Sequence, residues 1–266
     1  MSYFNFIWKS HRSFLLFSMV FISLFQFLIL RLVTTIDTST LMLVLDQIPE
    51  DIRALLGEDF VSMLTVEGTA ALGLNHPLVL VILSIGAIII PSRHIAGEIE
   101  TGTLELVLSF PVKRVNLLLN LCLSAMVFLF LIIFCALCSS LLSIHIFHEL
   151  TFDLFIKMVM IACNLWLLFL FIMTLSMVFS TFEKEANKVG IRVAGIVLIF
   201  YLLHYLSSIW DAIGFTKPFN IFNYYRPSDL ISGERSFLLH SAVLLFLIVS
   251  GLFISIFQFN RRDIPG

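Results

Sequence analysis

Six runs of apolar residues, each long enough to cross a lipid bilayer as a helix, dominate this chain of 266 residues. They lie at about 14–32, 78–95, 115–144, 154–182, 189–208 and 237–259. A helix of about 20 apolar residues spans the hydrocarbon core, because it satisfies its own backbone hydrogen bonds there. Charged residues make up 13% of the chain, against about 25% in a soluble domain. We therefore expect an all-α integral membrane protein with six transmembrane helices and one domain over 1–266.

Lysine and arginine residues near the ends of these runs predict the orientation. With an even number of spans, both termini lie on one side, and that side carries most of the 16 basic residues. They are Lys9, Arg12, Arg93, Lys113, Arg114, Lys184, Lys188, Arg192, Arg261 and Arg262. Because positive residues concentrate on the cytoplasmic side, both termini are expected to be cytoplasmic.

The segments that flank the spans predict further features. Residues 1–12 mix aromatic and basic side chains, which is typical of a helix lying in the membrane interface. Residues 34–77 form the longest polar insertion, predicted to be an outer loop with a short helix from Pro49 to Gly57. The interface anchors are expected to be Trp8, Arg12, Lys113, Arg114, Arg261 and Arg262.

A moderately polar stretch at 97–114 separates the second and third spans. At 100° per residue, an apolar stripe holds Ile95, Ile99, Thr103, Leu106 and Phe110, while Glu98, Glu105 and Ser109 lie opposite. Such a helix can lie along the inner membrane surface and present carboxylates to a soluble partner. Gly102 predicts a break or a close backbone contact inside it, and Pro111 predicts its end. The alternative is an ordinary amphipathic connection between two spans.

No motif for catalysis or nucleotide binding occurs in the sequence. The phosphate-binding G-x-x-x-x-G-K-[ST] loop, H-E-x-x-H and G-x-S-x-G are all absent. His145 and His148 have the spacing of metal ligands but lie in a short bend, and Cys135 and Cys138 fit helix packing better than a disulfide. We expect no catalytic residue, metal or cofactor on this chain, and no nucleic-acid partner.

Charged residues are nearly absent from the middle of the spans, where ion-driven carriers need them. His204, in the outer half of the fifth span, fits an interfacial hydrogen-bonding residue better than a proton relay. We therefore expect energy to enter from outside the membrane, through a partner ATPase.

The residues Glu98-x-Glu100-x-Gly102-Thr103-Leu104-Glu105, followed by Leu108-Ser109-x-Pro111-Val112-x-Arg114, resemble the signature of ABC-2 type permeases. These are membrane subunits of ATP-binding-cassette exporters. The chain is most similar to bacterial drug-exporter permeases and to the permease of the copper-site maturation system for nitrous oxide reductase. The resemblance covers most of the chain, and Ile99 departs from it where a polar or basic residue is common.

The resemblance implies partners and contact residues. Two cytoplasmic ATPase subunits, which hold ATP and Mg²⁺, would bind a coupling helix through Glu98, Glu100, Gly102, Thr103, Leu104 and Glu105. A second, smaller contact would comprise Glu183, Lys184, Glu185 and Lys188. A second permease subunit, identical or homologous, and the bacterial inner membrane complete the expected setting.

The expected function is that of an exporter's permease subunit, which is a transport subunit rather than an enzyme. One alternative is an ATPase-coupled scaffold or sensor for an envelope process, with a partner at the 34–77 loop. The other is an ion-coupled carrier that works alone.

Overall fold

The computed structural model describes residues 3–35, 65–109, 113–232 and 237–262, and within these ranges all regular structure is helical. Six helical segments are long and apolar enough to cross a membrane. They are Asn5–Thr35, Val66–Glu100, Arg114–Phe147, Phe152–Phe182, Ala186–Ser207 and Phe237–Arg261. The prediction of an all-α protein with six spans is confirmed.

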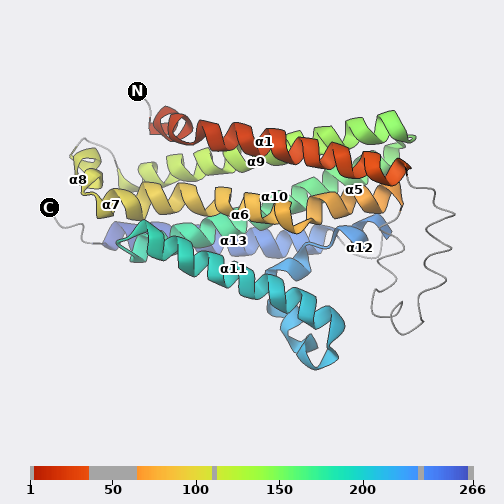
Figure 1. Ribbon diagram of the computed structural model, residues 1–266. Coiled ribbons are helices and arrows are strands. Elements are labelled where there is room, and N and C mark those ends of the chain that lie inside the picture. Colours follow the sequence, from red (N-terminus) through yellow and green to blue (C-terminus); the bar gives the residue numbers. More distant parts are fainter. Residues whose placement is uncertain (1–2, 36–64, 110–112, 233–236, 263–266) are drawn as a thin grey trace.

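Within the described ranges, the helices run in the following order (Figure 1). They are α1 (Tyr3–Thr35), α5 (Val66–Asn75), α6 (Pro77–Pro91), the π-helix η1 (Ser92–Gly97), α7 (Glu98–Glu100), α8 (Thr103–Leu108), α9 (Arg114–Phe147), α10 (Phe152–Phe182), α11 (Ala186–Ile209), the 3₁₀ helices η2 (Asp211–Phe219) and η3 (Ile221–Tyr224), α12 (Pro227–Ser232) and α13 (Phe237–Arg261).

Helix α10 is the most buried of the six spans and packs against α13, α9, α6 and α11. Its contact with α13 depends on Gly251, because a Cβ atom there would lie 2.6 Å from Cγ2 of Thr174. Small residues let helices approach closely in a membrane, where packing rather than the hydrophobic effect drives association. In contrast, α11 and α13 have mostly exposed surfaces, which suits contact with lipid or another subunit.

The N-terminal segment does not form a separate element. Residues 3–12 are the first turns of α1, one helix of 33 residues, so the predicted interfacial helix over 1–12 is not confirmed. Trp8 packs edge-on against Phe128 of α9, with ring centroids 6.5 Å apart, whereas Arg12 is exposed. Packing against α9 therefore continues the helix beyond the span that hydropathy predicted.

Helix α5 lies within residues 34–77, the segment predicted to be an outer loop. Thr65 caps this helix, with its hydroxyl accepting from the Gly68 amide at 3.0 Å. One face of α5 is buried, and the Gln26 side chain of α1 donates to the Ala70 carbonyl of α5 at 3.0 Å. Small residues make the segment only weakly hydropathic but allow it to pack closely. The helix predicted at 49–57 lies outside the described residues.

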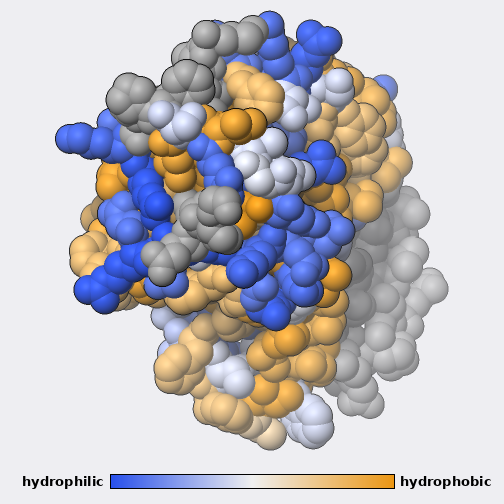
Figure 2. Space-filling view, turned by 90° about the vertical axis from the view of Figure 1, so that its left-hand side faces the viewer, coloured by the Kyte–Doolittle hydropathy of each residue, from blue (hydrophilic) through white to orange (hydrophobic). Residues whose placement is uncertain are grey.

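One end of the bundle gathers the start of α1, the end of α13, and α7 and α8 (Figure 1). We call it the polar end, because hydrophilic side chains gather on it (Figure 2). This arrangement agrees with the expectation that both ends of the chain share one side with the segment between the second and third spans.

Candidate functional site: the connector at the polar end

The chain leaves α6 through a π-helical turn rather than a sharp kink. Pro91 has no N–H and its ring crowds the carbonyl of the preceding turn, so the regular α-helical bonding cannot continue unchanged. The Ser92 amide reaches both the Ile88 and Ile89 carbonyls, and Ser176 of α10 donates to the Ile88 carbonyl at 3.1 Å. The chain at Pro91 therefore forms a wider turn, and η1 continues α6.

Helices η1, α7 and α8, residues 92–108, are called the connector here. Gly102 separates α7 from α8 with φ 72° and ψ 1°, the left-handed conformation. A side chain in this conformation costs about 1–2 kcal/mol, which glycine avoids. The break expected at Gly102 is present.

This break changes which side chains face the bundle. Leu104 is fully buried, whereas Thr103 is exposed and Leu106 is 67% exposed. Ile95 and Ile99 of the predicted apolar stripe pack against the bundle, whereas Thr103 and Leu106 point away from it, because the left-handed turn resets the helical periodicity. Phe110 lies outside the described residues.

The three predicted acidic contacts have different environments. Glu98 turns inward and its Oε1 lies 3.1 Å from Nδ1 of His94, with 12% of the Glu98 side chain exposed. Glu100 is exposed and accepts a hydrogen bond from the Ala186 amide at 3.0 Å. Glu105 is half-buried on α8. The expectation that Glu98 presents its carboxylate to a soluble partner disagrees with this inward position.

The Glu100 hydrogen bond brings together the two predicted contact regions, the connector and the link between α10 and α11. In that link, Glu183 forms an ion pair with Arg192, and Lys188 Nζ lies 2.6 Å from Glu185 Oε1. Lys184 is exposed. The link therefore forms one surface with the connector.

Two of the predicted interface anchors bind helix ends instead. Arg114 Nη1 donates to the Phe259 carbonyl at 3.3 Å and to the Arg262 carbonyl at 2.6 Å. Arg262 Nη1 donates to the carbonyls of Ser180 at 3.2 Å and Thr181 at 2.7 Å. These contacts satisfy carbonyls that helix C-termini leave without partners. Burial lowers the pKa of Arg262 from its ordinary value, while the guanidinium remains the charged donor.

The other anchors keep the character expected of them. Arg12 and Lys113 are exposed, and the Arg261 guanidinium lies over the Phe257 ring at 3.9 Å from its centroid. Their contact with lipid headgroups stays a prediction.

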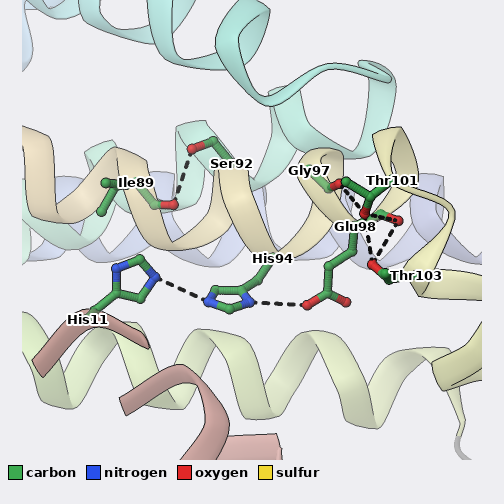
Figure 3. A network of polar contacts seen from close by, with 8 residues as sticks. All are labelled: His11, Ile89, Ser92, His94, Gly97, Glu98, Thr101 and Thr103. Carbon is green, nitrogen blue, oxygen red and sulfur yellow. Dashed lines mark hydrogen bonds and ion pairs between the residues drawn. The ribbon is translucent and has the colours of Figure 1, made fainter. Parts of the chain in front are cut away.

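A buried polar network that was not predicted from the sequence joins α1 and the connector (Figure 3). Nε2 of His11 lies 3.2 Å from Nε2 of His94, and Nδ1 of His94 lies 3.1 Å from Glu98 Oε1. His11 and His94 are only 4% and 5% exposed. The spacing of His94 and Glu98, four residues apart on a helix, was a readable signal, but nothing local pairs His11 with residues more than 80 positions away.

A groove runs along the side of the bundle between α6 and α11. Its apolar part has a volume of about 330 Å³ and is lined by residues that include Leu80, Ile85, Val197 and Phe222. A second part of about 480 Å³ continues it past Ile88 and Ala194 to Arg93 and Asn187, beside the connector. This shape suits an apolar molecule or helix. Among the described residues, no cluster of histidine, cysteine or acidic side chains could hold a metal ion.

The chain matches a family model described as ABC-2 family transporter protein over residues 9–264. No curated protein matches the chain. The matched region includes all six candidate spans almost completely, together with the whole connector.

Proposed function

Because this chain belongs to the ABC-2 family and is a membrane subunit of an ABC transporter, we propose that it is an exporter permease driven by a separate cytoplasmic ATPase. That partner, in two copies, holds ATP and Mg²⁺ and carries out hydrolysis. A second permease subunit, identical or homologous, completes the assembly by covering the exposed surface of α11. The chain resides in the bacterial inner membrane with both termini in the cytoplasm.

The observation that carries this proposal is the exposed outer side of the connector at the polar end. Leu106 is 67% exposed there, next to the exposed Thr103 and half-buried Glu105. An exposed apolar side chain with polar neighbours is typical of a protein interface. We place the ATPase contact on this side of the connector and on Lys184, and we assign Glu98 a role inside the permease.

The connector can transmit movement to two spans at once. η1 continues α6, and Glu100 of α7 holds the first turn of α11 through the Ala186 amide. When ATP binding draws the two ATPases together, displacement of the connector moves the polar ends of α6 and α11 as rigid elements. Because these two helices line the groove, its width follows the ATPase cycle.

The distribution of charge disfavours the ion-coupled alternative. In the described parts of the spans, Asp, Glu, Lys and Arg residues lie near helix ends. Carriers that couple transport to an ion place ionisable side chains near the middle of the membrane.

The test compares two substitutions that shorten an exposed apolar side chain. Leu106→Ser changes the connector, and Phe215→Ser changes η2, where Phe215 is 76% exposed. In the reconstituted complex with its ATPase, we expect Leu106→Ser to weaken association at least about tenfold, the effect of losing an interface hot spot. Phe215→Ser should bind and hydrolyse ATP as the native chain does. Native association and transport-coupled hydrolysis in Leu106→Ser would refute the proposed docking surface.

A further inference from the structure

The His11–His94–Glu98 network joins three elements that meet only in the folded chain (Figure 3). His11 belongs to α1, His94 to η1 and Glu98 to α7. The edge of the Phe6 ring packs against His94, with centroids 5.7 Å apart, and helps to exclude water. Buried polar groups of this kind are stable only while each keeps a partner. The protonation of the two histidines therefore decides whether the network can form.

The network can exist with no added proton. Neutral His94 then donates from Nδ1 to the Glu98 carboxylate and accepts at Nε2 from the Nε2–H of His11. Each imidazole uses one donor in this arrangement. The carboxylate of Glu98 is then the sole charge in the network.

The network can also hold one added proton, and this form has no net charge. His94 then carries protons on both nitrogens, donating to Glu98 from Nδ1 and to His11 from Nε2. His11 accepts at Nε2 and keeps its own proton on Nδ1. The added charge is balanced by Glu98, which favours an ion pair in a buried site.

A second proton breaks the network. If both imidazoles are charged, both Nε2 atoms carry a proton, and two N–H groups face one another across 3.2 Å. Neither atom can then accept, and two positive charges repel in a site that excludes water. We propose that His11, His94 and Glu98 form a proton-binding latch that closes with at most one bound proton and opens when a second proton binds.

The other charged groups near the latch do not supply the acceptor that is lost when both imidazoles are charged. Lys9 and Arg12 of α1 and Arg93 of η1 are exposed and positive, so they oppose further protonation while the latch is closed. In the described part of α6, no residue is titratable. The charged residues at the nearby ends of α9, α10 and α11 bond elsewhere: Arg114 to the end of α13, Glu183 to Arg192, and Lys188 to Glu185.

The direction of the pH effect follows from proton counting. Counted relative to two neutral imidazoles, the closed latch holds at most one added proton, whereas the open form holds two added protons at low pH. The form that binds more protons gains as pH falls, so acidification opens the latch. Because the open form binds one more proton than the closed form, the ratio of closed to open molecules should fall by up to about tenfold per pH unit as the pH is lowered.

Electron paramagnetic resonance on the full chain in lipid nanodiscs tests the latch without any ATPase. Spin labels are attached at Ser10→Cys on α1 and Leu106→Cys on α8, both exposed, after the four native cysteines are replaced. Between about pH 8 and about pH 5 we expect the compact distance population to decrease in favour of a broader one. An unchanged distribution over this range would overturn the proposal.

Two histidine variants distinguish the latch from general acid sensitivity. His11→Gln can donate to or accept from His94 but cannot become charged, so its distance distribution should not respond to pH. His145→Gln, an exposed site at the far end of α9, should respond as the native chain does. A native pH response in His11→Gln would also overturn the proposal.

The consequence for transport depends on the proposed function, whereas the latch itself does not. In the complex with the ATPase, acidification should reduce coupled hydrolysis in the native chain and have less effect in His11→Gln. If the label distances respond as expected but coupling does not, the proton-binding latch stands and the connector's role in coupling fails.

Discussion

Single side chains at the polar end satisfy the backbone groups that helix ends leave unpaired. Arg114 and Arg262 donate to the last carbonyls of α13 and α10, and Glu100 accepts from the first amide of α11. Hydrogen bonds to charged groups contribute more to stability than neutral ones. Without them, the backbone groups at these helix ends would lack partners, which is costly where water is scarce. Residues that looked like membrane anchors in the sequence therefore hold helices together.

Replacing Arg262 should loosen the end of α10. Arg262→Ala removes the donor to Ser180 and Thr181, and we expect a loss of about 1–2 kcal/mol in the free energy of unfolding, since charge-assisted bonds are involved and the site is partly exposed. Denaturant unfolding in mild detergent measures it. Arg261→Ala, which removes only a contact with Phe257, should cost less. Equal losses in the two variants would contradict the capping role of Arg262.

Gly102 is the second residue whose conformation matters. A Cβ atom there meets nothing within 4 Å, so Gly102→Ala tests backbone strain alone. We expect a loss of about 1 kcal/mol or a shifted α7–α8 turn, and with it weaker ATPase association. Gly195→Ala in α11 is the matched control, because it also meets nothing within 4 Å but has no positive φ. In the control, association should be unaffected and thermal stability unchanged or slightly higher, because alanine favours a helix interior; a loss there equal to that of Gly102→Ala would argue against strain.

At the scale of elements, the two joints of the connector are held by different contacts. Ser176 of α10 supports the π-turn, while the hydroxyls of Thr101 and Thr103 lie 2.9 Å apart across the left-handed Gly102 turn. Under the proposed function, movement applied to α7 passes into α6. The bond from Glu100 to Ala186 extends that movement to α11.

Breaking the Glu100 contact should release the start of α11. Glu100→Ala leaves the Ala186 amide without its side-chain acceptor, and we expect a loss of about 1 kcal/mol, as for other helix N-caps. Hydrogen exchange followed by mass spectrometry should show faster exchange in the first turn of α11. Glu100→Gln keeps an acceptor oxygen and should restore most of the protection. Unchanged exchange in Glu100→Ala would remove the proposed link between the connector and α11.

At the scale of the whole molecule, the polar end collects the features that we propose face the cytoplasm. The start of α1, the end of α13 and the connector lie together, and hydrophilic side chains cover this end (Figure 2). η2 and η3, with the exposed aromatic residues Phe215 and Phe219, lie away from it. Aromatic side chains of this kind suit the opposite membrane interface.

Labelling with a membrane-impermeant thiol reagent tests this orientation. In a chain without native cysteines, Thr103→Cys on the connector should react in inside-out vesicles and stay protected in intact spheroplasts. A cysteine at Phe219, which is 80% exposed, should show the reverse pattern. Reaction of Thr103→Cys in intact spheroplasts would invert the proposed topology and place the connector outside the cell.

The amino-acid sequence by itself determined the membrane class, the six spans and the break at Gly102. These depend on local properties: the length of apolar runs, the cost of charge in lipid and the conformational range of glycine. Only the tertiary structure decided that α5 packs in the bundle, that Leu106 is exposed and that Glu98 turns inward to His94 and His11. Each of those depends on contacts between residues distant in the chain, or on a turn that resets the periodicity, and local patterns do not encode such contacts.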